Sequence, residues 1–290
     1  MVDITWSHPD GRIALWHLDD AGGVVVKEHK TAPGMALVNV TEGAALWRYP
    51  DGGIKLWHLD GDGNRLLYFE KKKGPYDGWR AVNCTRTGGD ALTWLGSLLW
   101  HHTDGRISLW KIDANLDVDR LGYKESGPYQ GWTPIQLEGD NLLWQRGDGR
   151  ISYWRLTPEG TNGGYTEHGP HDGWSAIGCT RIAGTAERRI LWRHRDGGVS
   201  YWAVTRDGEM AKNSLHPAGY AEYAPGGNWR AIGCGHDRIL WHDPVGRRIS
   251  VWRMGQDLRM IDSRIYPAHT SPRAADLAPD RDWQPVSIGV

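Results

Sequence analysis

The sequence is poor in several residue types, and each shortage narrows the class of protein. It contains one Phe and three Cys in 290 residues. The cysteines, Cys84, Cys179 and Cys234, are odd in number and have no Cys-x-x-Cys spacing, which argues against a disulfide framework and a zinc ribbon. We therefore expect reduced thiols and no bound metal or cofactor.

An excess of positive charge is also missing, as is any long hydrophobic run. The 34 Lys and Arg residues against 35 Asp and Glu residues leave a formal net charge of −1. The chain as a whole therefore lacks the positive electrostatic field that would attract a nucleic acid. No apolar stretch approaches the ~20 residues that cross a bilayer. Because residues 1–6 also lack the features of a secretory signal, we expect a soluble protein, cytoplasmic or released by a non-classical route, with no nucleic-acid partner and no membrane insertion.

Tryptophan is the residue in excess, with 18 copies, and nearly all of them recur at regular positions. Two registers have six members each, and every member of the second follows its partner by ten or eleven residues. The first register is Trp6, Trp47, Trp100, Trp144, Trp192 and Trp241, the second is Trp16, Trp57, Trp110, Trp154, Trp202 and Trp252, and a third is Trp79, Trp132, Trp174, Trp229 and Trp283. Only Trp94 has no counterpart.

Each repeat contains the signals of four short strands and their turns. Between the first two Trp registers lies an Asp-Gly turn such as Asp104-Gly105, which favours a type I′ hairpin because Gly takes positive φ freely. A third strand follows, typified by residues 122–125, then a Gly-Pro-Tyr-x-Gly-Trp loop such as 74–79, and then a fourth strand of small residues such as 81–84. The approximate repeats are 1–34, 35–78, 79–131, 132–173, 174–228 and 229–282, with 283–290 completing the first unit.

Six units of four strands without helical periodicity predict an all-β protein: a six-bladed β-propeller of four-stranded antiparallel blades. The small-residue strand fits best at the axis, where strands converge. The chain begins at the second strand of a blade and ends on an inner-type strand, residues 284–290. We therefore expect one domain, 1–290, whose ring is closed by the C-terminal strand, leaving no open edge.

One face of such a propeller would collect aromatic, basic and acidic side chains. The Gly-Trp loops and the Asp-Gly hairpins fall on it together, and five of the six outer strands end near it in a glutamate. These glutamates are Glu28, Glu70, Glu125, Glu167 and Glu222. Flat aromatic rings beside forked donors and carboxylates suit sugars, which have apolar C–H faces and hydroxyl rims, and repetition around a ring would add avidity.

The repeat, exemplified by Asp104-Gly105-Arg106-Ile107-Ser108-Leu109-Trp110, resembles the tachylectin-type and bacterial propeller lectins. The resemblance covers the whole chain as a pattern and implies carbohydrate binding without catalysis, at sites between adjacent blades. Residues 32–35 and 224–229 depart from the loop pattern, so we expect at most four equivalent sites. The candidate ligand-binding residues are Tyr76, Trp79, His102, Arg106, Tyr129, Trp132, Arg146, Arg150, His171, Trp174 and His194.

Structural explanations compete with this hypothesis. The Trp of the two strand registers are expected to pack between blades, the loop aromatics could form packed corners, and the glutamates could simply pair with arginines such as Arg106. Trp94, in the insert 85–97, could cap the channel or contact a partner.

Two other functions remain open. One is an enzyme with its site at the axial channel, formed by Cys84, Cys179, Cys234, His236 and Asp237, although free cysteines are more often buried as small hydrophobes. The other is a protein-interaction platform on the same face.

Overall fold

The computed structural model describes the chain except residues 1, 20, 22, 30–33, 42–43, 60–64, 89–94, 114, 116, 183–184, 270–281 and 290. Within strands, side chains are described except at positions 2, 65–71, 87–88, 95, 118–121 and 289. The described part contains no helix, and therefore none long and apolar enough to cross a membrane. Trp94 lies outside the described residues, as do Ala32 and Pro33.

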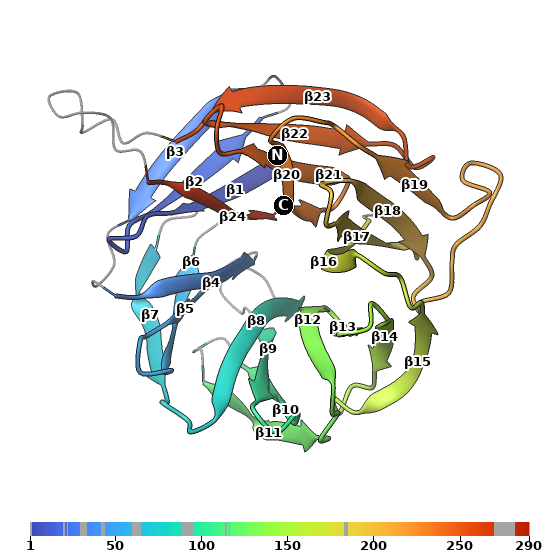
Figure 1. Ribbon diagram of the computed structural model, residues 1–290. Coiled ribbons are helices and arrows are strands. Elements are labelled where there is room, and N and C mark those ends of the chain that lie inside the picture. The colour runs from blue at the N-terminus through green and yellow to red at the C-terminus, as the bar shows by residue number, and fades with distance from the viewer. Residues whose placement is uncertain are drawn as a thin grey trace, which may run out of the picture.

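Twenty-four strands form six four-stranded antiparallel sheets arranged around a central axis, which confirms the six-bladed propeller (Figure 1). Blade 1 consists, from the axis outward, of β24 (Gln284–Gly289), β1 (Val2–Ser7), β2 (Ile13–Leu18) and β3 (Val24–His29), and blade 2 of β4 (Ala36–Thr41), β5 (Ala44–Arg48), β6 (Ile54–Leu59) and β7 (Arg65–Lys73). Blade 3 contains β8 (Trp79–Gly88), β9 (Leu95–His102), β10 (Ile107–Ile112) and β11 (Val118–Ser126), and blade 4 contains β12 (Trp132–Glu138), β13 (Asn141–Arg146), β14 (Ile151–Leu156) and β15 (Asn162–His168). Blade 5 contains β16 (Trp174–Arg181), β17 (Arg188–His194), β18 (Val199–Val204) and β19 (Tyr220–Tyr223), and blade 6 contains β20 (Arg230–Gly235), β21 (Arg238–Asp243), β22 (Arg248–Met254) and β23 (Met260–Pro267).

The ring is closed by the C-terminal strand, as the sequence predicts. β24 pairs antiparallel with β1, and the register places Ile4 opposite Ile288 and Asp3 opposite Gly289. The first and last strands of the chain therefore lie side by side near the axis, in one blade (Figure 1). This pairing leaves neither strand with an unpaired edge at the join.

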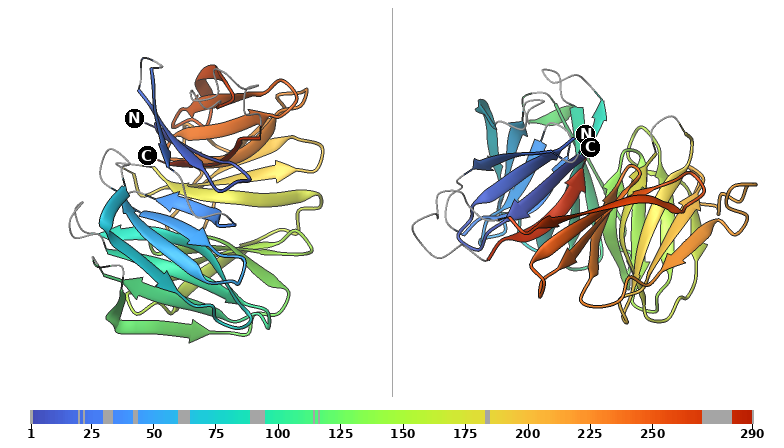
Figure 2. Two further views of the ribbon diagram at one scale, coloured as in Figure 1. Left: turned by 90° about the vertical axis from the view of Figure 1, so that its left-hand side faces the viewer. Right: turned by 90° about the horizontal axis from the view of Figure 1, so that it is seen from above.

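The connections divide between two faces of the ring, which the side views display (Figure 2). One face carries the hairpins between the second and third strands of each blade and the links between blades; we call it the Trp-loop face. The opposite face carries the turns between first and second strands and between third and outer strands. At the Asp104-Gly105 hairpin, Gly105 has a φ of 94°, a conformation that glycine adopts without steric cost.

Tryptophan pairs fill the spaces between blades. In every blade the Trp of the second strand is buried, with 0–1 % exposure, and its ring centroid lies 4.7–5.1 Å from that of the Trp on the third strand. The six hydrophobic clusters of the described residues each join two consecutive blades. Leu46 and Leu56 of blade 2, for example, pack with Trp100 of blade 3.

Amide side chains on the inner strands fasten neighbouring blades near the axis. Asn83 of β8 donates to the carbonyl oxygen of Leu137 in β12 (2.8 Å) and accepts from its backbone N–H (3.0 Å). Asn39 makes the same two contacts with the backbone of Cys84, and Gln136 makes them with Cys179. Each amide follows a β-bulge in its strand, where an extra residue redirects the side chain.

We predict that Asn83→Ala destabilises the protein. The substitution leaves the N–H and C=O of Leu137 buried without partners, and each such group costs about 1–3 kcal/mol. Chemical denaturation should show the decrease in the free energy of unfolding, whereas Ser175→Ala, at an exposed inner-strand position, should leave it within about 0.5 kcal/mol. An Asn83→Ala protein as stable as the control would contradict the role of this amide.

Deletion of residues 284–290 should abolish the native state, because it removes the inner strand of blade 1 and opens the ring. The expected result is loss of the cooperative urea transition monitored by Trp fluorescence. Ser287→Ala, which keeps the backbone of β24, is the matched control. A truncated protein that still unfolds cooperatively would show that closure by β24 is dispensable.

Candidate functional site

The link between two blades places an aromatic ring on the tryptophan pair of the next blade. Tyr76, in the link from blade 2 to blade 3, lies edge-on to Trp100 and Trp110, with centroid distances of 5.4 and 5.3 Å. Tyr129 does the same in blade 4, at 5.3 and 4.9 Å from its pair, and His171 in blade 5, at 5.4 and 5.3 Å. These three predicted site residues therefore cap the packing between blades, while Tyr76 keeps 38 % of its surface exposed.

His171, the histidine among these three rings, is more shielded from solvent than a surface histidine. Burial, and then the charge of His168, lower the pKa of His171. His171 is accordingly neutral at physiological pH, and its ring acts at this position as the tyrosines act in blades 3 and 4.

In blades 3 and 5 the tryptophan that begins the inner strand contacts the end of the second strand. Trp79 packs against His102 at 4.9 Å between ring centroids, and Trp174 packs against His194 at the same distance. In blade 4 the register places Trp132 opposite Arg146. The structure thus brings the predicted site residues together blade by blade.

The Asp-Gly hairpin anchors a basic side chain over this tryptophan in blade 3. Asp104 accepts from the backbone N–H of Arg106 (3.0 Å) and from its Nε (2.8 Å). The backbone hydrogen bond from Arg106 is the largest cause of a lowered pKa for Asp104. The Arg106 guanidinium also donates to Glu125 (3.1 Å) and lies 5.5 Å from the Trp79 ring centroid.

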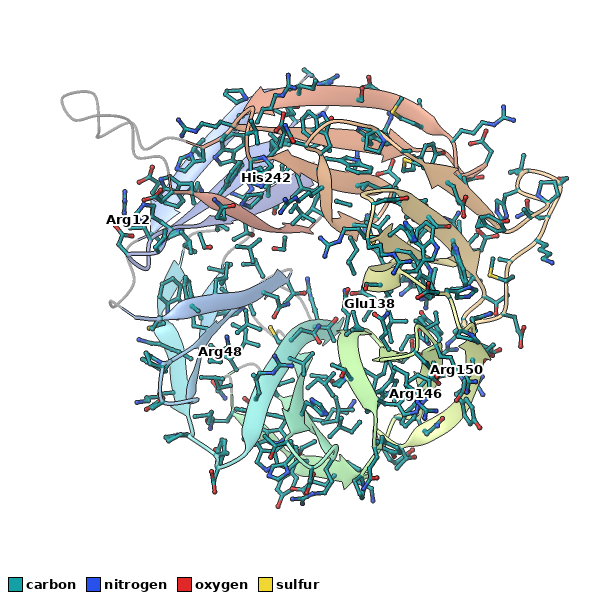
Figure 3. All side chains as sticks on the ribbon, viewed as in Figure 1. Arg12, Arg48, Glu138, Arg146, Arg150 and His242 are labelled. Carbon is teal, nitrogen blue, oxygen red and sulfur yellow. The ribbon has the colours of Figure 1, made fainter. Side chains whose placement is uncertain are left out.

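The hairpin cluster varies between blades. In blade 4, the Nε atoms of Arg150 and Arg146 lie 3.6 and 3.8 Å from the carboxylate of Asp148. Both distances are beyond hydrogen-bond range, so neither Nε is hydrogen-bonded to the carboxylate as that of Arg106 is. Both lie away from the central opening, toward β14 and β15 (Figure 3). Blade 5 has Gly198 at the position of the arginine.

Two further blades carry the same cluster outside the predicted set. Arg12 lies 5.2 Å from the Trp283 ring and bonds Asp10 in blade 1, and its place on the rim is visible in Figure 3. Arg248 lies 5.1 Å from Trp229 and bonds Asp243 in blade 6. The sequence signal for the clusters in blades 1 and 6 was the presence of Trp283 and Trp229 in the third register.

The outer strands add exposed tyrosines that the predicted set omits. Tyr123 is 61 % exposed and pairs across the sheet with Trp110, while Glu125 pairs with Ser108, so all four lie on one face of blade 3. The indole N–H of Trp110 donates to Ser108 at 3.0 Å. We call the pairs on blades 3, 4 and 5 the Tyr-Glu strips: Tyr123 with Glu125, Tyr165 with Glu167, and Tyr220 with Glu222.

The strips are alike in their exposure and in their neighbours. Tyr165 and Tyr220 are 61 and 46 % exposed, and the Trp beside each bonds a serine two residues earlier at 2.8 Å. The Tyr-x-Glu spacing, which puts both side chains on one face of a strand, was the sequence signal for the strips. The side chain of Glu70 lies outside the described residues, and Glu28 of blade 1 bonds His269 instead.

The residues of the alternative enzymatic site divide between two cavities. Cys84, Cys179 and Cys234 line an axial cavity of about 180 Å³ together with Glu138 and His236, whereas Asp237 lines a second cavity of about 390 Å³ that His236 also borders. Burial raises the pKa of Cys84 and of Cys234 to about 12, and it raises the pKa of Cys179 well above its usual range. Among the described residues, no three His, Cys, Asp or Glu side chains are grouped as metal ligands.

Comparison with known proteins relates the chain to propellers of several kinds. No family model and no curated protein matches the sequence. A chain in the crystal structure of a nidogen/laminin complex has a TM-score of 0.61 at 11 % identity, covering 100 % of this chain and 98 % of that one. The SapL1 lectin in complex with alpha methyl fucoside has a TM-score of 0.51 at 11 % identity, covering 93 % and 97 %. The β-propeller domain of Cps50 (Swd1) from Myceliophteria thermophila has a TM-score of 0.51 at 12 % identity, covering 92 % and 83 %. These similarities show the fold.

The three thiols should resist modification in the folded protein. For Cys84 and Cys234, a pKa near 12 lowers the thiolate fraction at pH 8 by roughly a thousandfold relative to an ordinary cysteine. The pKa of Cys179 is raised as well, and burial of all three thiols excludes the reagent. Titration with a chromogenic disulfide reagent at pH 8 should therefore detect three thiols promptly in denaturant and almost none in the native protein. Prompt native reaction of even one thiol would contradict this placement.

Proposed function

We propose that the protein is a multivalent carbohydrate-binding protein, a lectin, whose sugars bind at the Tyr-Glu strips between adjacent blades. The observation that carries the proposal is the threefold recurrence of an exposed tyrosine, a glutamate and the edge of a tryptophan on blades 3, 4 and 5. Packing alone does not require a tyrosine that is 61 % exposed at the same register of two blades.

The chemistry of each strip suits a monosaccharide. The exposed tyrosine offers apolar surface to a sugar C–H face, and the glutamate accepts hydrogen bonds from hydroxyl groups. The tryptophan beside it adds partly exposed surface in blades 3 and 5, whereas Trp154 of blade 4 is buried. In blade 3, Arg106 adds donors beside Glu125. One small ligand at one strip gives weak binding, and three strips on one rigid ring supply avidity for a surface that displays many copies.

The fucoside complex of the similarly folded SapL1 lectin supports this proposal by analogy of fold. Protein binding is a second candidate, because the outer strands of neighbouring blades 1 and 6 expose apolar side chains. Val25 is 59 % exposed, Ile261 59 % and Ile265 60 %. The nidogen/laminin complex is the corresponding analogue.

Glycan-array binding that is inhibited by the free sugar is the test, with variants that assign it to the strips. Tyr123→Ala should weaken the affinity of that strip about 2- to 10-fold, because it removes roughly 0.5–1.5 kcal/mol of aromatic contact. The triple change of Tyr123, Tyr165 and Tyr220 to Ala should abolish retention on the array.

Lys124→Ala is the matched control, since Lys124 is exposed on the same strand and points to the other face of the sheet. It should bind glycans as the unaltered protein does. Full retention of glycan binding by the triple variant, or failure of the unaltered protein to bind any glycan, would refute the proposal.

A further inference from the structure

A cleft on the opposite face collects positive charge that the carbohydrate proposal does not use. Strand residues of blade 3 and the turns of blades 4 and 5 surround a cavity of about 770 Å³, within the range of small-molecule sites. Its charged lining residues are Arg86, Lys111, Asp140, Arg181, Arg188 and Arg206. Five cations and one carboxylate thus line it, in a chain whose formal net charge is −1.

The one lining carboxylate is shared by two arginines. Arg206 donates through Nε to Asp140 at 3.1 Å and through a second nitrogen to the same oxygen. Arg188 approaches the other oxygen of Asp140 only to 4.0 Å. Asp140 therefore balances about one of the two guanidinium charges.

Arg188 is the most informative residue, because its charge is buried without a full set of partners. Its exposure is 7 %; one terminal nitrogen donates to the backbone carbonyls of Ala186 (3.3 Å) and Glu187 (3.4 Å), and its Nε has no hydrogen-bond partner. A buried guanidinium with unfilled donors is costly. A negatively charged ligand in the cleft would lower that cost.

Two more cations are free to contact a ligand. The side chain of Arg181 has no hydrogen-bond or ion-pair partner among the described residues, and the same is true of Lys111, whose charge is one of the causes that lower the pKa of Glu159. The nearby Glu138, which lines the axial cavity and stands beside the central opening (Figure 3), offsets only part of one positive charge at neutral pH. Burial raises its pKa to about 7 against the lowering effect of Arg188 and Arg181.

The remaining walls limit the kind of anion. Leu109, Leu156 and Pro158 supply apolar surface, and no aromatic side chain is among the described lining residues, so the cleft offers no ring on which a nucleobase would stack. Guanidinium forks match the oxygens of a phosphate monoester, which carries up to two charges. We propose that the cleft is a second binding site, for a small non-aromatic phosphate ester.

The test uses glucose 6-phosphate as the probe and glucose as its uncharged counterpart, each titrated into the full chain by calorimetry. We expect saturable binding of one glucose 6-phosphate per chain that inorganic phosphate displaces and that Arg181→Glu weakens at least tenfold. Lys124→Glu makes the same change of charge on an outer strand and should have no effect. Lys111→Gln should also weaken binding, and near-UV circular dichroism verifies that each variant is folded.

Several results would overturn the assignment. They are the absence of saturable binding, equal weakening by Arg181→Glu and Lys124→Glu, binding of glucose as strong as that of glucose 6-phosphate, and displacement by sulfate as effective as by phosphate, which would indicate a general oxyanion site. Each titration is repeated with the variant in which Tyr123, Tyr165 and Tyr220 are changed to Ala, so that sugar bound at the Tyr-Glu strips is not counted at the cleft and the two proposals fail separately.

Discussion

The contact between the tryptophan pair of one blade and the aliphatic face of the preceding blade is the interaction on which the rest of the structure depends. Each sheet has two apolar faces, and a single blade could not cover either of them. The pair supplies a large, rigid surface at every interface, and the six clusters it organises run around the whole ring. Closure by β24 then removes the last open interface.

This packing also determines where on the surface a ligand can bind. The second-strand tryptophans are buried, and exposed aromatic surface lies farther out, at the link residue Tyr76 and on the outer strands. Tyr76 lies at the first of these places and Tyr123 at the second, with ring centroids 5.3 and 6.3 Å from that of Trp110. The site we propose is thus the exposed continuation of the interface between blades, and its repetition follows from the repetition of the fold.

Much of the fold could be predicted from the sequence because its signals are local and repeated. The Trp registers indicated the number of blades, the Asp-Gly turns indicated the hairpins, and the small residues of the inner strands indicated which strand lies at the axis. The sequence also placed Trp79, His102 and Arg106 among the candidate residues of one face, and the structure brings these side chains together. Their role in binding stays a prediction.

The sequence was less informative about features that depend on contacts between blades. The amide of Asn83 reaches Leu137, 54 residues away, through a bulge that no local pattern marks. The basic cleft draws Lys111 from strand β10 and Asp140 and Arg206 from turns, in three different blades, and these positions share no motif. Only the arrangement in space shows that Arg188 is buried with an unfilled donor.

The central claim is that three equivalent surfaces on one ring bind sugar, and the stoichiometry of binding tests it most directly. Once the array identifies a glycan, calorimetric titration with its terminal monosaccharide should give about three sites per chain, one for each Tyr-Glu strip. A stoichiometry of one would point to a unique pocket, such as the axial cavity beside Cys84, and would contradict the account.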